Sequence, residues 1–155
     1  MSSAAPLPAP PPLAPRLAWA VLLALASGFT LSQAYRTVAS IMGPPLAAEL
    51  ALTPQQLGLW AAAYHFSFGL MQLVMGVSID LFGVRRTIVW AFPVAVVGGV
   101  MSALAPSFGW LLLGQVLIGS GCAPAFLVCT VFIARYFPAA RFTAVSGLVM
   151  SISGL

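Results

Sequence analysis

Four polar side chains that could bind a ligand lie within otherwise apolar stretches of this sequence. They are Arg36, Gln33, His65 and Gln115. A charged side chain at the centre of a membrane span costs about 2.5–3.5 kcal/mol on insertion scales, so such a residue generally has a function. A guanidinium beside amide and imidazole groups suits an anion, which arginine grips through two parallel hydrogen bonds. These residues therefore form a candidate binding site for a small anionic ligand.

A structural role for the same residues stays open. The side chain of Arg36 could extend outward toward Glu49 or toward lipid headgroups, and His65 could simply join two helices. One helix face around Arg36 carries small or polar residues at every fourth position, namely Gly28, Ser32, Arg36 and Ser40. Such a face suits either a water-filled cavity or a tight contact between helices.

A second concentration of charge lies in the segment GVSIDLFGVRR, between two apolar runs. Asp80 is one of 2 acidic residues in the chain, and Arg85 and Arg86 are two of its 6 basic residues. Gly83 permits a tight reversal, and Gly76 permits close approach of another helix. The segment predicts a turn of about eight residues at a membrane surface, where the carboxylate and guanidinium groups pair or bind helix ends.

The elements that position these residues are apolar segments long enough to cross a bilayer. Of the 155 residues, 61% are hydrophobic and 5% are charged, and the mean hydropathy is +1.07. A helix needs about 20 apolar residues to span the hydrocarbon core. Four segments approach or exceed that length and a fifth supplies about half of it. They cover residues 17–43, 58–79, 88–105, 110–134 and, incompletely, 142–155.

We therefore predict an all-α integral membrane protein, a polytopic helix bundle whose partner is the lipid bilayer. Residues 1–16, rich in proline and alanine, are predicted to form a disordered cytoplasmic tail. A secretory signal peptide over residues 1–34 is disfavoured, because several further spans follow it.

Other classes of protein are disfavoured by the composition. The net charge of +4 is spread over scattered arginines, which gives no basic face for a nucleic acid. Cys122 and Cys129 with one histidine lack zinc spacing, so no metal or other cofactor is expected. An enzyme is not expected either, because Asp80 and Glu49 fall on opposite sides of the bilayer and form no acid–base pair.

The orientation follows from the basic residues. One side of the predicted zigzag carries Arg16, Arg85, Arg86, Arg135 and Arg141. The loops on the other side carry Glu49 and no basic residue. The positive-inside rule then places the amino terminus in the cytoplasm of a multi-pass protein of the cell membrane, expected to be a bacterial inner membrane. A tryptophan near the start of each span suits an interfacial anchor; these are Trp19, Trp60, Trp90 and Trp110.

Two motifs resemble those of the major facilitator superfamily of transporters. The spacing of Gly76, Asp80, Gly83, Arg85 and Arg86 between the second and third spans resembles the family's signature loop, although Leu81 and Val84 stand where basic residues are common. The fourth span is similar to the family's fourth-helix motif through its paired glycines, Gly119 and Gly121, with Gln115 in place of the motif's arginine.

The resemblance implies a transporter of small solutes built from two six-helix halves, working by alternating access. Residues 17–155 would be a partial amino-terminal domain, truncated in the fifth transmembrane helix and unable to transport without the missing carboxyl-terminal helices. Asp80 would be a conformational latch with Arg85 and Arg86 as local partners. Spans one and four would line the cavity, which favours Arg36 and Gln115 as substrate ligands. The alternative is a small four-span membrane scaffold or partner subunit without transport activity.

Overall fold

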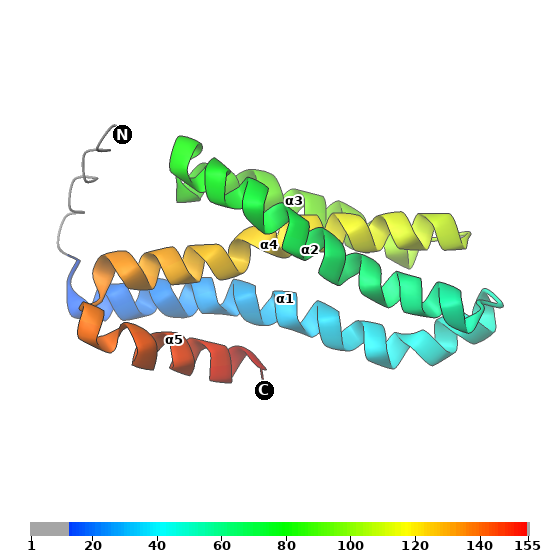
Figure 1. The fold of residues 1–155 in the computed structure, drawn as a ribbon, viewed down its shortest axis with the longest axis horizontal. Coiled ribbons are helices and arrows are strands. Elements are labelled where there is room, and N and C mark those ends of the chain that lie inside the picture. Colours follow the sequence, from blue (N-terminus) through cyan, green and yellow to red (C-terminus); the bar gives the residue numbers. More distant parts are fainter. Residues whose placement is uncertain (1–12, 155) are drawn as a thin grey trace, which may run out of the picture.

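The computed structural model describes residues 13–154, which form five α-helices joined by short turns. The helices are α1 (Pro15–Glu49), α2 (Pro54–Phe82), α3 (Val84–Ala103), α4 (Phe108–Tyr136) and α5 (Ala139–Gly154). Successive helices run in opposite directions along a common long axis (Figure 1). Most of the predicted tail, residues 1–12, lies outside the described residues, and Pro15 and Arg16 belong to α1 instead of the tail.

Four of these helices are long and apolar enough to cross a membrane. The candidate spans are Pro15–Val38, Pro54–Phe82, Val84–Ala103 and Phe108–Tyr136, and the shorter Ala139–Ser153 is also apolar. The predicted all-α polytopic bundle is therefore confirmed. The antiparallel order gathers the arginine-bearing helix ends at one end of the bundle, the left-hand end of Figure 1. We call this the arginine end.

Helix α1 continues well past its predicted end at residue 43. It runs through Pro44 and Pro45 to Glu49, although a proline inside a helix removes a backbone hydrogen bond. The extension is held by tertiary packing, because Leu46 packs against the cluster of Trp60 and Leu111. Burial of these apolar side chains outweighs the local preference of the two prolines.

Helix α2 begins four residues earlier than predicted, because Thr53 and Gln56 form a capping box. The Gln56 backbone N–H donates to Thr53 Oγ1 at 3.3 Å, and the Thr53 backbone N–H donates to Gln56 Oε1 at 2.9 Å. This pair satisfies two of the backbone donors that a helix start leaves unpaired. Proline at the first helical position adds a preset φ angle.

The predicted eight-residue turn between α2 and α3 is wrong in its length. Gly83 alone separates the two helices and has φ +81°, a conformation that glycine adopts without steric cost. Asp80 consequently lies in the last turn of α2, and Arg85 and Arg86 lie in the first turn of α3. One glycine thus reverses the chain where the sequence pattern indicated a loop.

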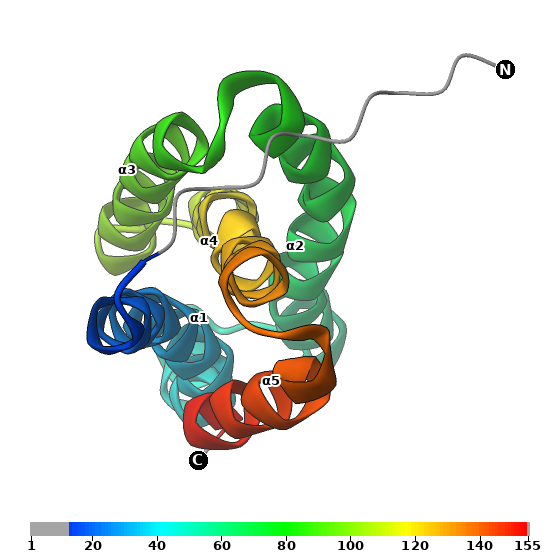
Figure 2. The same ribbon diagram turned by 90° about the vertical axis from the view of Figure 1, so that its left-hand side faces the viewer.

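Helix α4 lies at the centre of the bundle and contacts each of the other four helices (Figure 2). Its glycines bring neighbouring backbones close: a Cβ at Gly121 would lie 2.6 Å from Ala91 O in α3, and one at Gly119 would lie 2.5 Å from Tyr64 O in α2. The glycines of the fourth span therefore allow its backbone to pack closely against α2 and α3. Cys122 and Cys129 are buried free thiols within this core.

The tryptophans do not all serve as interfacial anchors. Trp19, Trp90 and Trp110 are exposed, at 39%, 79% and 51%, as an anchor at the membrane surface requires. Trp60 is 3% exposed and packs in the same core cluster as Leu111. Its interfacial role was wrongly predicted, because helix packing covers its ring.

Candidate functional site

Three of the four candidate ligand-binding residues meet between α1 and α2. Arg36 Nε donates to His65 Nε2 at 3.2 Å, and Arg36 Nη1 donates to Gln33 Oε1 at 2.9 Å. Gln33 precedes Arg36 by about one turn of α1, which places both side chains on one face. The contact with His65 crosses from α1 to α2. We call Gln33, Arg36 and His65 the arginine cluster.

The hydrogen bonds of the arginine cluster specify the tautomer of His65. Its Nε2 accepts from Arg36, so in the neutral ring the N–H is on Nδ1. This Nδ1 lies 3.1 Å from the backbone carbonyl oxygen of Ala61 and donates to it. The imidazole is therefore a neutral acceptor that orients the guanidinium, and Arg36 carries the positive charge of the cluster.

The arginine cluster lies far from the helix ends. At about 1.5 Å per residue, Arg36 is about 20 Å from the end of α1 at Glu49, and His65 is about 17 Å from the start of α2 at Pro54. The Arg36 guanidinium bonds to uncharged partners, and no described acidic side chain pairs with it. The proposed contact with Glu49 is not formed, because the side chain is held at the depth of His65.

The Arg36 side chain is exposed, and its hydrogen bonds to described side chains are made by Nε and Nη1. A fixed guanidinium edge that is accessible from one side can receive a carboxylate or phosphate in a bidentate pair. The chemistry available to the arginine cluster is therefore recognition of an anion. Among the described residues, no group of three or more His, Cys, Asp or Glu side chains could hold a metal ion.

Gln115 does not join the arginine cluster. It lies in α4 with 6% of its surface exposed, and no hydrogen bond among the described residues connects it with Gln33, Arg36 or His65. It follows Gly114, where α4 closely approaches Ser102 of α3. The central position of α4 buries this face of the helix.

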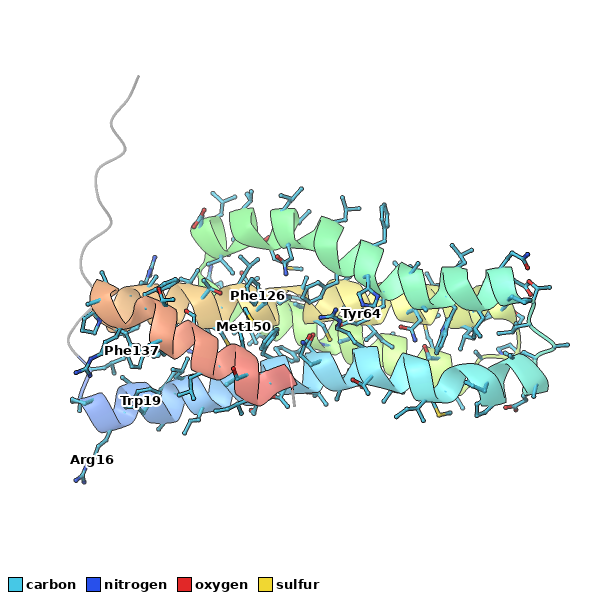
Figure 3. The ribbon with its side chains drawn as sticks, turned by 60° about the horizontal axis from the view of Figure 1, so that its bottom comes forward. Arg16, Trp19, Tyr64, Phe126, Phe137 and Met150 are labelled. Carbon is cyan, nitrogen blue, oxygen red and sulfur yellow. The ribbon has the colours of Figure 1, made fainter. Side chains whose placement is uncertain are left out.

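A buried hydrogen-bonded pair beside the cluster was not anticipated from the sequence. Tyr64 donates its hydroxyl to the backbone carbonyl of Ser32 at 3.0 Å, and Ser32 Oγ lies 2.9 Å from the same hydroxyl. Both residues are 1% exposed, and Tyr64 points into the middle of the bundle (Figure 3). A tyrosine inside an apolar span was the available signal, because its hydroxyl needs a partner there.

The Tyr64–Ser32 pair sets the position of the arginine cluster. Tyr64 directly precedes His65 in α2, and Ser32 directly precedes Gln33 in α1. A fixed contact between Tyr64 and Ser32 therefore holds the two helices in the register at which His65 and Arg36 meet. Buried polar contacts of this kind specify one arrangement of helices more strictly than apolar packing does.

The residues of the predicted signature loop lie at the arginine end of the bundle. Asp80, Arg85 and Arg86 are all exposed, and Asp80 forms no ion pair with either arginine in the described part of the chain. The expected local pairing is thus not formed in this structure. A Cβ at Gly76 would meet no atom within 4 Å, so the close helix contact predicted there is also not formed.

A family model described as Major Facilitator Superfamily matches residues 19–155. The chain belongs to the Major Facilitator Superfamily. The resemblance predicted from the signature loop and the fourth span is therefore confirmed. Membership, together with the apolar helices, indicates a multi-pass membrane protein.

Curated relatives of this superfamily member are transporters and a resistance protein. The fosmidomycin resistance protein of Escherichia coli (strain K12) is 28% identical over 110 residues, covering 68% of this chain and 26% of the relative. The hexuronate transporter of Bacillus subtilis (strain 168) is 27% identical over 116 residues, covering 75% of this chain and 28% of the relative. The matched part thus spans about a quarter of these relatives. No solved structure matches the chain.

Proposed function

We propose that this chain is the amino-terminal part of a larger facilitator-type secondary transporter that moves a small organic anion across the cell membrane. The proposal rests mainly on Arg36, an exposed charged residue in the middle of the helix pair α1 and α2 whose guanidinium is held by His65 and Gln33. Arg36 falls within the candidate span Pro15–Val38, where an uncompensated charge is costly unless it serves a ligand or a water-filled path. A carboxylate would neutralise it through two hydrogen bonds.

Two relatives support the larger assembly, and one of them supports a carboxylate substrate. The matched regions cover 26% and 28% of two relatives, so further helices would complete the transporter and bring a second half against this one. The Bacillus subtilis relative is a hexuronate transporter, and a hexuronate is a sugar acid with a carboxylate. We propose the same chemical class here, a small carboxylate, with Arg36 as its main ligand and Gln33 and His65 as the residues that orient Arg36. Gln115 remains a second proposed contact from α4.

The proposed mechanism is alternating access, in which two halves rock about a site near the middle of the bilayer. The amino terminus and the arginine end would face the cytoplasm of a bacterial inner membrane, following the positive-inside rule. Asp80 would act as a latch toward the second half, since it is exposed at the arginine end and unpaired within the described residues. Arg85 and Arg86 would flank that contact.

Uptake into vesicles tests the proposed function. The complete gene product that contains these residues is reconstituted into lipid vesicles. The vesicles are loaded with unlabelled sugar acids. The counterflow of a labelled hexuronate is then compared with the counterflow of a labelled neutral hexose. We expect the acid to accumulate above empty vesicles and the neutral sugar not to. Movement of the neutral sugar alone would contradict the anionic substrate. A coding frame that stops at Leu155, with no counterflow, would favour the four-span scaffold.

The same vesicles test the latch. We expect Asp80→Asn to slow counterflow severalfold while equilibrium binding of the acid stays within about twofold, because the carboxylate acts on the conformational change and lies far from Arg36. Arg135→Gln, which alters an exposed charge at the same end of the bundle, is the matched control. Unchanged counterflow in Asp80→Asn would show that the latch assignment is wrong.

A further inference from the structure

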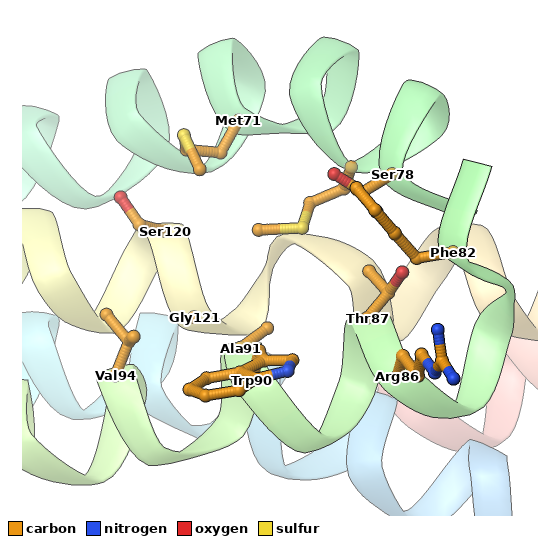
Figure 4. A pocket seen from close by; sticks show the side chains of 11 residues that line it. Met71, Ser78, Phe82, Arg86, Thr87, Trp90, Ala91, Val94, Ser120 and Gly121 are labelled. Carbon is orange, nitrogen blue, oxygen red and sulfur yellow. The ribbon is translucent and has the colours of Figure 1, made fainter. Parts of the chain in front are cut away.

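A groove separate from the arginine cluster runs between α2 and α3, with α4 as its floor. It has a volume of about 530 Å³ and is lined by residues from all three helices. Ligand pockets in proteins typically enclose about 300–1,000 Å³, so the groove is large enough for part of a small molecule or a lipid chain. Figure 4 shows α2 along one side, α3 along the other and α4 behind them.

The groove has one charged end and an apolar remainder. Arg86 lies at the end near the Gly83 turn, whereas Met71 and Val94 lie toward the other end (Figure 4). Arg86 and Val94 are eight positions apart on α3, which is about 12 Å along the helix axis. A ligand that fits must therefore combine an anionic group with an apolar body extending along the helices.

The surroundings of the groove indicate that this ligand comes from the bilayer. Both walls belong to candidate membrane spans, Pro54–Phe82 and Val84–Ala103. The helix surfaces beside the groove carry exposed apolar side chains, including Val77 at 59%, Leu81 at 70% and Val89 at 61%. Such surfaces are suited to lipid tails and are unsuited to water, so the groove is entered sideways from the membrane.

We propose that the groove binds an anionic phospholipid, with one acyl chain between α2 and α3 and the phosphate on Arg86. Basic pockets between membrane helices on the cytoplasmic side recognise anionic headgroups, and a guanidinium binds phosphate through paired hydrogen bonds. Arg86 is exposed and forms no ion pair with Asp80 among the described residues, so its charge is available. Trp90, which also lines the groove, would contact the lipid near its glycerol.

Charge complementarity selects the anionic lipid over a zwitterionic one. The arginine end carries Arg16, Arg85, Arg86, Arg135 and Arg141, while Asp80 is the only acidic residue at that end within the described part of the chain. The resulting positive field attracts phosphatidylglycerol, whereas the choline of a zwitterionic lipid is repelled. Lipid binding in the groove is independent of the identity of the transported solute.

Quenching of Trp90 by brominated lipids tests the proposal. The protein is placed in nanodiscs containing equal mole fractions of brominated phosphatidylglycerol or brominated phosphatidylcholine. The contribution of Trp90 is obtained by subtracting the fluorescence of Trp90→Phe. We expect brominated phosphatidylglycerol to quench Trp90 at least twofold more strongly than brominated phosphatidylcholine. Addition of inorganic phosphate should leave the difference unchanged, because a free anion lacks the acyl chain.

Substitutions at two adjacent positions distinguish lipid binding at the groove from a general attraction by the positive charge of the arginine end. Arg86→Gln should abolish the preference for phosphatidylglycerol, whereas Arg85→Gln, an exposed neighbour that does not line the groove, should retain it. Equal quenching by both lipids in the unmodified protein would overturn the proposal, as would equal losses in the two variants. Competition by inorganic phosphate would instead indicate a soluble anion and would also overturn it.

A third substitution keeps the test decisive if Arg86→Gln does not fold. Val94→Phe preserves the arginine but fills the apolar part of the groove, so it should reduce the preference by displacing the acyl chain. Circular dichroism of each variant checks that its helical content is retained. A folded Val94→Phe protein with an undiminished preference would contradict acyl-chain binding in the groove.

Discussion

Replacement of Gly121 by alanine is expected to prevent α3 from packing on α4. The added Cβ would lie 2.6 Å from the Ala91 carbonyl oxygen and 2.7 Å from Ala95 Cβ, and it would also collide with the Ala95 backbone nitrogen. Backbone atoms in a helix cannot move aside as the end of a flexible side chain can. Overpacking of a core typically costs about 1–3 kcal/mol, and a clash with backbone lies at or above the upper end.

The measurement is the recovery of monodisperse protein after detergent extraction, followed by thermal unfolding monitored by circular dichroism. Gly109→Ala is the matched control, because it makes the same change in α4 at a position where a Cβ meets no atom within 4 Å. Alanine favours a helix over glycine by about 1 kcal/mol, so this control should unfold at the same temperature or higher. Similar losses in both variants would show that the contact with α3 is not the cause.

Replacement of Arg36 by glutamine is expected to abolish high-affinity binding of a carboxylate substrate by the complete transporter. Glutamine retains a hydrogen-bond donor but loses the charge and the planar fork. A hydrogen bond to a charged group contributes about 1.5–3 kcal/mol, which corresponds to about 10- to 150-fold in Kd for each bond lost. Arg36→Lys keeps the charge without the fork and should lose less affinity than Arg36→Gln.

Binding is measured by isothermal titration with the hexuronate that gives the strongest counterflow, and by scintillation proximity where the signal is small. Arg135→Gln is the control, since Arg135 is an exposed arginine in the last turn of α4, far from the cluster. It should bind the substrate with unchanged affinity. If Arg36→Gln binds as tightly as the unmodified protein, then Arg36 has a structural role and the anion site lies elsewhere.

His65 determines the geometry of the arginine cluster through both of its ring nitrogens. Its Nε2 accepts from Arg36, and its Nδ1 donates to the backbone carbonyl oxygen of Ala61 one turn earlier in α2. The second contact holds the imidazole ring in place on α2, and the first then sets the direction in which the Arg36 guanidinium points.

The class of fold, the family and the alternating direction of the helices could all be predicted from the amino-acid sequence. Long apolar segments with few charges require helices that satisfy their own backbone hydrogen bonds in lipid, and the arginines mark one end of each antiparallel pair. The local sequence motif was sufficient to predict the chain reversal at Gly83, because a tight turn between two spans requires a residue that tolerates positive φ. Arg36 and His65 lie at similar distances from the same end of the bundle, and this could also be predicted by counting residues along their spans.

Which polar groups meet depends on how the helices pack together and could not be predicted from the sequence. The depth of Arg36 was compatible with Glu49, lipid headgroups or His65, and the Tyr64–Ser32 pair between α1 and α2 selects His65. Gln115 has a similar polarity, yet the central position of α4 buries it apart from the cluster. Periodicity along one helix specifies a face but not the rotation and register of its neighbour. Those depend on contacts between residues distant in sequence, and here these contacts arise from a buried hydroxyl and from glycines that let helix backbones touch.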